Sequence, residues 1–96
     1  MKENVSHKVL VIEDHPEMQA ILKRFLAEKA YEVITADNAE VGLEIYNKIQ
    51  PDIILMDIML PGMSGLEATK LIRKKHGENR YTPIIMLTAK NKTDEI

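Results

Sequence analysis

The side chains of this sequence that could do chemistry follow short apolar runs. Glu13 and Asp14 follow the first run, Asp57 follows the third and Thr88 follows the fourth. Carboxylates gathered in one pocket repel each other, and a hard divalent cation relieves that repulsion. Oxygen ligands without His or Cys suit Mg²⁺, or Mn²⁺, rather than zinc, and Mg²⁺ commonly bridges to phosphoryl oxygens. If the fold brings these acids together, the sequence predicts a magnesium site.

The apolar runs themselves predict strands. They lie at residues 9–12, 33–36, 53–56 and 84–87. Three of them are continuous rather than alternating, which is typical of strands buried on both faces of a parallel sheet. Polar residues precede the second run, so we expect that strand at a sheet edge.

The segments between these strands have the spacing of apolar residues that is typical of helices. Apolar residues recur at i, i+3 and i+4 in three segments, which predicts three amphipathic helices. Asp14 or His15 is a candidate cap for the first helix, ahead of Pro16, and the third helix is expected to close near His76. The three stripes consist of Met18, Ile21, Leu22, Phe25 and Leu26, then Ala39, Leu43, Tyr46 and Ile49, and finally Ala68, Leu71 and Ile72.

Alternating strands and helices predict an α/β fold with a doubly wound parallel sheet. In the order 2-1-3-4, the first and third strands are neighbours, and their crossovers leave in opposite directions. Ligands bind at such a switch point, outside the carboxyl ends of the strands. That order would gather Glu13, Asp14 and Asp57 into one pocket with Thr88 beside it. The competing interpretation is that each acid is a solvated loop residue.

Composition limits the alternatives. The 96 residues carry 13 Lys and Arg against 15 Asp and Glu, a net charge of −2, so a nucleic-acid surface is not expected. The absence of Cys excludes disulfides and thiolate metal sites. No apolar run approaches the length of a membrane span, and the start of the chain lacks the apolar region of a signal peptide. We expect one domain over 1–96, with a polar tail at 1–7, in the cytoplasm.

Three motifs then resemble the receiver domains of two-component response regulators. They are VLVIED at 9–14, DIILMDIMLPGMSG at 52–65 and PIIMLTA at 83–89. The middle motif is highly specific, and the resemblance runs from Lys8 to the last residue. It implies a flavodoxin-like fold and a role in signal transduction, without steady enzymatic turnover.

The resemblance implies how the phosphoryl group is handled. Asp57 resembles the phosphoacceptor, which takes its phosphate from a sensor histidine kinase or a phosphotransfer protein. Thr88 resembles the hydroxyl residue that hydrogen-bonds the phosphoryl group and moves on activation. Ala89 is small and would leave room for that group. An output domain, if there is one, would lie outside this chain.

The resemblance also implies a metal set. Asp14 corresponds to the direct Mg²⁺ ligand and Glu13 to its water-mediated companion. Asp57 would ligate the same ion, and the backbone carbonyl of Met59 would be the remaining ligand that the protein supplies.

Receiver domains further have a lysine at the end of a fifth strand, followed by a last helix. None of the 96 residues fills those positions, and Lys90 is too close to Thr88 to substitute. The sequence therefore predicts a receiver incomplete at its C-terminal side, with weakened chemistry at Asp57. The fourth strand would be an uncovered apolar edge, which favours a homodimer or an exchange of elements between copies.

Two other functions remain open from the sequence. A receiver-like binding module without phosphorylation would not bind Mg²⁺ at these acids. A phosphohydrolase of the haloacid dehalogenase type would turn over phosphoesters, but it needs Asp-x-Asp after its first strand. Here that strand is followed by Glu13, Asp14, His15 and Pro16. His15 borders the acid pair and is expected at the surface.

Overall fold

A four-stranded parallel sheet forms the centre of the computed structural model, which describes residues 7–75 and 81–87. Its strand order is β2-β1-β3-β4, as the sequence predicts. The expected end of the third helix at His76 lies outside the described residues. The elements are β1 (Lys8–Ile12), α1 (Pro16–Ala27), β2 (Glu32–Ala36), α2 (Ala39–Ile49), β3 (Ile53–Asp57), α3 (Gly65–Lys75) and β4 (Ile84–Leu87).

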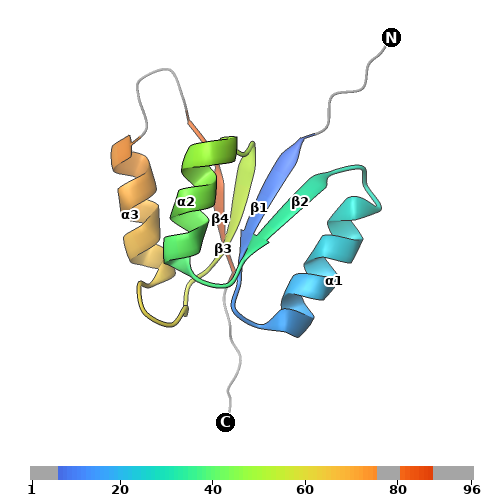
Figure 1. Cartoon of the computed structure of the whole chain (residues 1–96), viewed down its shortest axis with the longest axis horizontal. Coiled ribbons are helices and arrows are strands. Elements are labelled where there is room, and N and C mark those ends of the chain that lie inside the picture. The colour runs from blue at the N-terminus through green and yellow to red at the C-terminus, as the bar shows by residue number, and fades with distance from the viewer. Residues whose placement is uncertain (1–6, 76–80, 88–96) are drawn as a thin grey trace.

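The helices lie on both faces of the sheet. Figure 1 shows α2 and α3 side by side on one face and α1 on the other. Alternate side chains of a strand point to opposite faces. In β1, Leu10 and Ile12 join the core under α2 and α3, whereas Val9 and Val11 point to the side of α1, and all four are buried. The continuous apolar run of β1 is thus explained by burial on both faces.

The core lies mainly between the sheet and the pair α2 and α3. The strands contribute Ile54 and Met56 beside β1, and the helices contribute Tyr46, Ala68 and Ile72, all of them buried. Small residues of α2 approach the sheet closely, since Gly42 lies against the side chain of Ile12.

The opposite face is less covered. Helix α1 contacts β2, but none of its residues is buried. Of its predicted apolar stripe, Leu22 and Leu26 are half-buried, whereas Ile21 and Phe25 are 60% and 54% exposed. Over the described residues, α1 is the one helix on this face. Met18 is exposed as well, so only two of the five residues of the predicted stripe, Leu22 and Leu26, are partly packed.

Local sequence signals set the helix ends. Asn38 caps α2 by accepting a hydrogen bond from the Val41 amide at 2.8 Å. Ser64 and Glu67 exchange hydrogen bonds in a capping box at the start of α3. His15 occupies the N-cap position of α1, ahead of Pro16, but its side chain makes no capping hydrogen bond. In the described part of the chain, no helix has both the length and the apolar character needed to cross a membrane.

Candidate functional site

The carboxyl ends of β1 and β3 place two buried acids next to each other. The strands are paired with Ile12 opposite Met56, so Glu13 and Asp57 follow at the same edge of the sheet. The two residues are only 4% and 2% exposed. The Glu13 amide donates to the carbonyl of Ala36 at 3.0 Å, which extends the β1–β2 pairing into the site.

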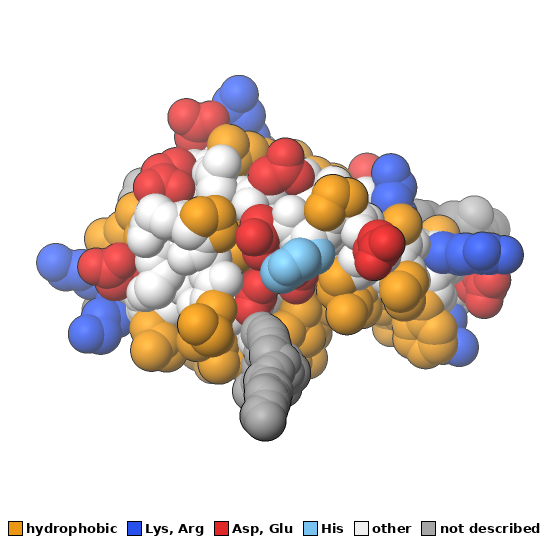
Figure 2. Space-filling model, turned by 90° about the horizontal axis from the view of Figure 1, so that it is seen from below, with side chains coloured by type: hydrophobic (Ala, Val, Ile, Leu, Met, Phe, Trp, Pro, Cys, Tyr) orange, Lys and Arg blue, Asp and Glu red, His pale blue; other side chains and the backbone are white. Residues whose placement is uncertain are grey.

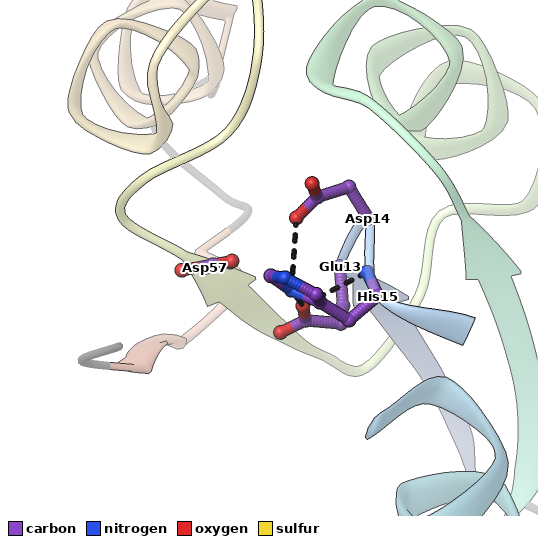
Figure 3. A group of neighbouring side chains, drawn as sticks. All are labelled: Glu13, Asp14, His15 and Asp57. Atoms are coloured by element: carbon purple, nitrogen blue, oxygen red, sulfur yellow. Dashed lines mark hydrogen bonds and ion pairs between the residues drawn. The ribbon is translucent and has the colours of Figure 1, made fainter. Parts of the chain in front are cut away.

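Four titratable side chains meet here. One ligand atom from each of Glu13, Asp14, His15 and Asp57 lies within 4.8 Å of the others. Figure 3 shows the first three on the end of β1 and Asp57 on the end of β3, facing them. Figure 2 views the molecule from this end and shows acidic side chains gathered around a histidine. The sequence predicted the convergence of the three acids, and the structure adds His15.

His15 folds back over Glu13. Its Nδ1 lies 3.0 Å from Glu13 Oε2 and 3.4 Å from Asp14 Oδ1, and its backbone amide donates to the same Glu13 oxygen at 3.1 Å. The hydrogen bond to Glu13, followed by the negative charge of Asp14, raises the pKa of His15. The ring is nevertheless 67% exposed, so it can turn toward solvent. Exposure was predicted for His15, and the contact with both acids was not.

The buried side chain of Asp57 is destabilised in its charged form. Its Oδ1 accepts a hydrogen bond from the Met59 amide at 3.1 Å, which favours the charged form. Burial outweighs that bond, and the charges of Glu13 and Asp14 act in the same direction as burial, so the pKa of Asp57 is raised. A carboxylate in this state gains from a bound cation.

Asp14 gives the second sign of a cation site. Its Oδ1 is buried without a hydrogen-bond partner, and it is the one such side-chain atom among the described residues. Buried polar atoms without a partner are rare in native structures, and an ion is one of the usual reasons. Together with Glu13 and Asp57, this oxygen forms a hard donor set, so the residues fit Mg²⁺.

The backbone around the acids is fixed by contacts that the sequence did not reveal. The amide of Gly65 donates to Ile58 at 3.1 Å, and the amide of Ile58 donates to Leu87 at 3.2 Å. The side chain of Gln19, on α1, donates to the carbonyl of Glu13 and to Asp37. These bonds hold the β3–α3 loop and the end of β1 in place. Gln19 is a polar residue one turn into α1, and such a position could have indicated a hydrogen bond to the preceding loop.

The other predicted site residues are placed as follows. Met59 lies two residues beyond Asp57 with its side chain exposed, and its amide rather than its carbonyl contacts Asp57. Thr88 and Ala89 lie outside the described residues. Leu87, the last residue of β4, pairs with Asp57, so the chain reaches the site at that point.

Comparisons with known proteins agree with this arrangement. The family model of the response regulator receiver domain matches residues 9–96. The transcriptional regulatory protein YdfI of Bacillus subtilis (strain 168) is 42% identical over 87 residues, which cover 88% of this chain and 39% of YdfI. The chain thus spans less than half the length of that relative.

Two solved structures are similar over most of the chain. One is response regulator TrrA of Thermotoga maritima in complex with Mg²⁺–BeF, with a TM-score of 0.78 and 39% identity over 85% of this chain and 69% of that one. The other contains histidine kinase ThkA in complex with TrrA, with a TM-score of 0.79 and 33% identity over 94% of this chain and 84% of that one.

Proposed function

Because this chain belongs to the response regulator receiver domain family and hence to two-component signalling, we propose that Asp57 accepts a phosphoryl group in a Mg²⁺-dependent reaction. The observation that carries the proposal is the state of the acids. Asp57 is buried and destabilised as an anion, and an oxygen of Asp14 beside it has no hydrogen-bond partner. The complex of TrrA with Mg²⁺–BeF supports the same assignment.

Each residue has a defined part in this reaction. A carboxylate oxygen of Asp57 attacks the phosphorus of a phosphohistidine, the bond from phosphorus to the histidine nitrogen breaks, and an aspartyl phosphate forms. The amide of Met59 orients the carboxylate through its bond to Oδ1. When bound, Mg²⁺ neutralises the acids and the charge on the phosphoryl oxygens.

The metal would be held by oxygen atoms. Asp14 and Asp57 are proposed as direct ligands, Glu13 as a ligand through water, and the carbonyl of Met59 as the backbone ligand. Mn²⁺ is the second cation that this donor set suits.

The partners follow from the same proposal. The donor would be a histidine kinase or a phosphotransfer protein, in line with the structure of ThkA bound to TrrA. Thr88 would hydrogen-bond the phosphoryl group and signal its presence, with Ala89 leaving room for it. Residues 1–96 would act as one receiver domain in the cytoplasm, with a polar tail at 1–7 and any output domain outside this segment.

Beryllofluoride binding tests the proposal, because beryllofluoride imitates a phosphoryl group on a carboxylate. We expect Mg²⁺ to raise the melting temperature of the protein and beryllofluoride to raise it further only when Mg²⁺ is present. A ligand at a hundred times its Kd stabilises by about 2.7 kcal/mol, a shift of roughly ten degrees or more for a chain of this size. Differential scanning calorimetry measures both steps.

Asp57→Asn should abolish the beryllofluoride step. The control is Glu44→Gln, which removes an acid exposed on α2 and should leave both steps intact. A beryllofluoride shift of equal size in Asp57→Asn, or no response of the unaltered protein to Mg²⁺, would contradict the proposal. The second result would favour a binding module without phosphorylation.

The edge of the sheet leads to a separate expectation about partners. Over the described residues, β4 is an edge strand, and its Ile85 is half-exposed. Apolar edge strands pair readily with strands of other chains. We expect the protein to self-associate through β4, with a mass that rises with concentration in light scattering. Ile85→Lys should restore the monomer, and a monomeric unaltered protein at high concentration would exclude the pairing.

A further inference from the structure

We infer that His15 supplies a nitrogen ligand to the cation site, so that the site takes borderline cations such as Ni²⁺ and Co²⁺ through a mixed nitrogen and oxygen set. The inference rests on the proposed function, since it adds one ligand to the metal set proposed there. It makes His15 a residue that determines which cation is preferred.

The distances around Nδ1 carry the inference. Ligand atoms that lie about 2.1 Å from one cation, at angles between 90° and 109°, are about 3.0 to 3.4 Å apart. Nδ1 of His15 lies 3.0 Å from Glu13 Oε2 and 3.4 Å from Asp14 Oδ1. Both distances from Nδ1 therefore match the spacing of neighbouring ligands on one cation. One ligand atom of Asp57 lies within 4.8 Å of one from each of the other three residues.

The backbone holds His15 in this position. Its amide donates to Glu13 Oε2 at 3.1 Å, which keeps the residue folded over the acid at the end of β1. Figure 3 shows the imidazole lying between Glu13 and Asp14 and facing Asp57. The ring thus faces the acids, although most of its surface is open to solvent. His15, Asp14 and Asp57 therefore already place one ligand atom each within 4.8 Å of the others.

The chemistry of the two donor types sets the expected preference. Imidazole suits nickel, copper and zinc, whereas Mg²⁺ takes oxygen ligands and keeps several waters. The exposed ring can turn away when Mg²⁺ is bound by the carboxylates alone. His15 should therefore contribute to the affinity for Ni²⁺ and contribute little to the affinity for Mg²⁺.

The test compares Ni²⁺ and Mg²⁺ affinities, by isothermal titration calorimetry, in the unaltered protein and in His15→Gln. Loss of an outer-sphere partner alone changes metal affinity by about 10- to 100-fold, so loss of a direct ligand should lower the ratio of Ni²⁺ to Mg²⁺ affinity at least about tenfold. The absorption spectrum of bound Co²⁺ should change in the same variant, because a nitrogen ligand is lost.

His7→Gln is the matched control. His7 is also exposed and also lies near an acid, with Nδ1 3.7 Å from Asp52 Oδ2, but only one carboxylate is involved. This variant should keep the affinity ratio and the Co²⁺ spectrum. If His15→Gln keeps them as well, while Mg²⁺ still binds, the role of His15 is wrong and the proposed function stands. If Mg²⁺ does not bind the unaltered protein, the proposed function itself fails.

Discussion

Alanine in place of Gly65 is expected to lower the free energy of unfolding by roughly 3 kcal/mol or more. A Cβ atom at this position would overlap the carbonyl oxygen of Asp57 and lie 3.1 Å from the Cα of Ile58. Both are backbone atoms, so no side chain can rotate to make room. The start of α3 or the end of β3 would have to move, and the second movement displaces Asp57, the proposed phosphoacceptor. Urea unfolding followed by circular dichroism measures the loss.

Gly62→Ala is the control for this prediction. Gly62 has a φ of +74°, but a Cβ there would meet only the side chain of Glu40, at 3.6 Å. Its substitution should cost about 1 kcal/mol through backbone strain. If Gly65→Ala costs no more than Gly62→Ala, the close packing of α3 against the end of β3 is not as described. Mg²⁺ affinity should fall in Gly65→Ala, because the loop from Asp57 to Gly65 positions the acid.

Asp57→Asn is expected to raise the melting temperature of the metal-free protein near neutral pH. The pKa of Asp57 is raised above its ordinary value of 3.8 by burial and by the neighbouring acids. When the pKa of a carboxyl is higher in the folded than in the unfolded protein, the folded state loses stability as the pH rises from the unfolded-state pKa through the folded-state pKa. The side-chain amide of the Asp57→Asn variant stays neutral at every pH, so the variant is not destabilised in this way. The stability difference between the variant and the unaltered protein should vanish below about pH 3.8, where Asp57 is protonated in both the folded and the unfolded state.

Melting curves from acid to neutral pH, without metal, measure this difference. Glu44→Gln again serves as the control, because it removes an exposed charge and should show no comparable gain. Mg²⁺ should reverse the order by stabilising the unaltered protein more than Asp57→Asn. The explanation would be wrong if the amide variant were less stable at neutral pH without metal, or if the difference did not change with pH.

The strand pattern explains why much of this arrangement could be predicted from the sequence. Burial on both faces makes the runs around Leu10 and Ile54 continuously apolar, and polar residues at the start of β2 place it at an edge. Once the order β2-β1-β3-β4 is fixed, residues at the carboxyl ends of β1 and β3 must meet. Glu13, Asp14 and Asp57 therefore converge as expected, while their roles stay predictions.

Other features depend on side-chain rotamers and close packing, which periodicity does not encode. The position of His15 over Glu13 depends on the turn after β1, where both the amide and Nδ1 of His15 contact Glu13 Oε2. The contact of Gly65 with the backbone of Asp57 depends on how the β3–α3 loop closes. Helical spacing identified the stripe of α1, but it does not say how much of the stripe is covered. Ile21 and Phe25 are exposed for that reason.

Trapping of the aspartyl phosphate tests the central claim most directly. The protein is incubated with a small phosphodonor such as acetyl phosphate, with and without Mg²⁺, and is then reduced with borohydride. An acyl phosphate on aspartate becomes homoserine under these conditions, and peptide mass spectrometry locates it. We predict homoserine at position 57, formed only with Mg²⁺ and absent from Asp57→Asn. A phosphoryl group on Asp14 would give homoserine at position 14, and one on Glu13 would give 2-amino-5-hydroxypentanoic acid, which differs in mass. Modification at either residue, or at no position, would contradict the assignment of Asp57 as the phosphoacceptor.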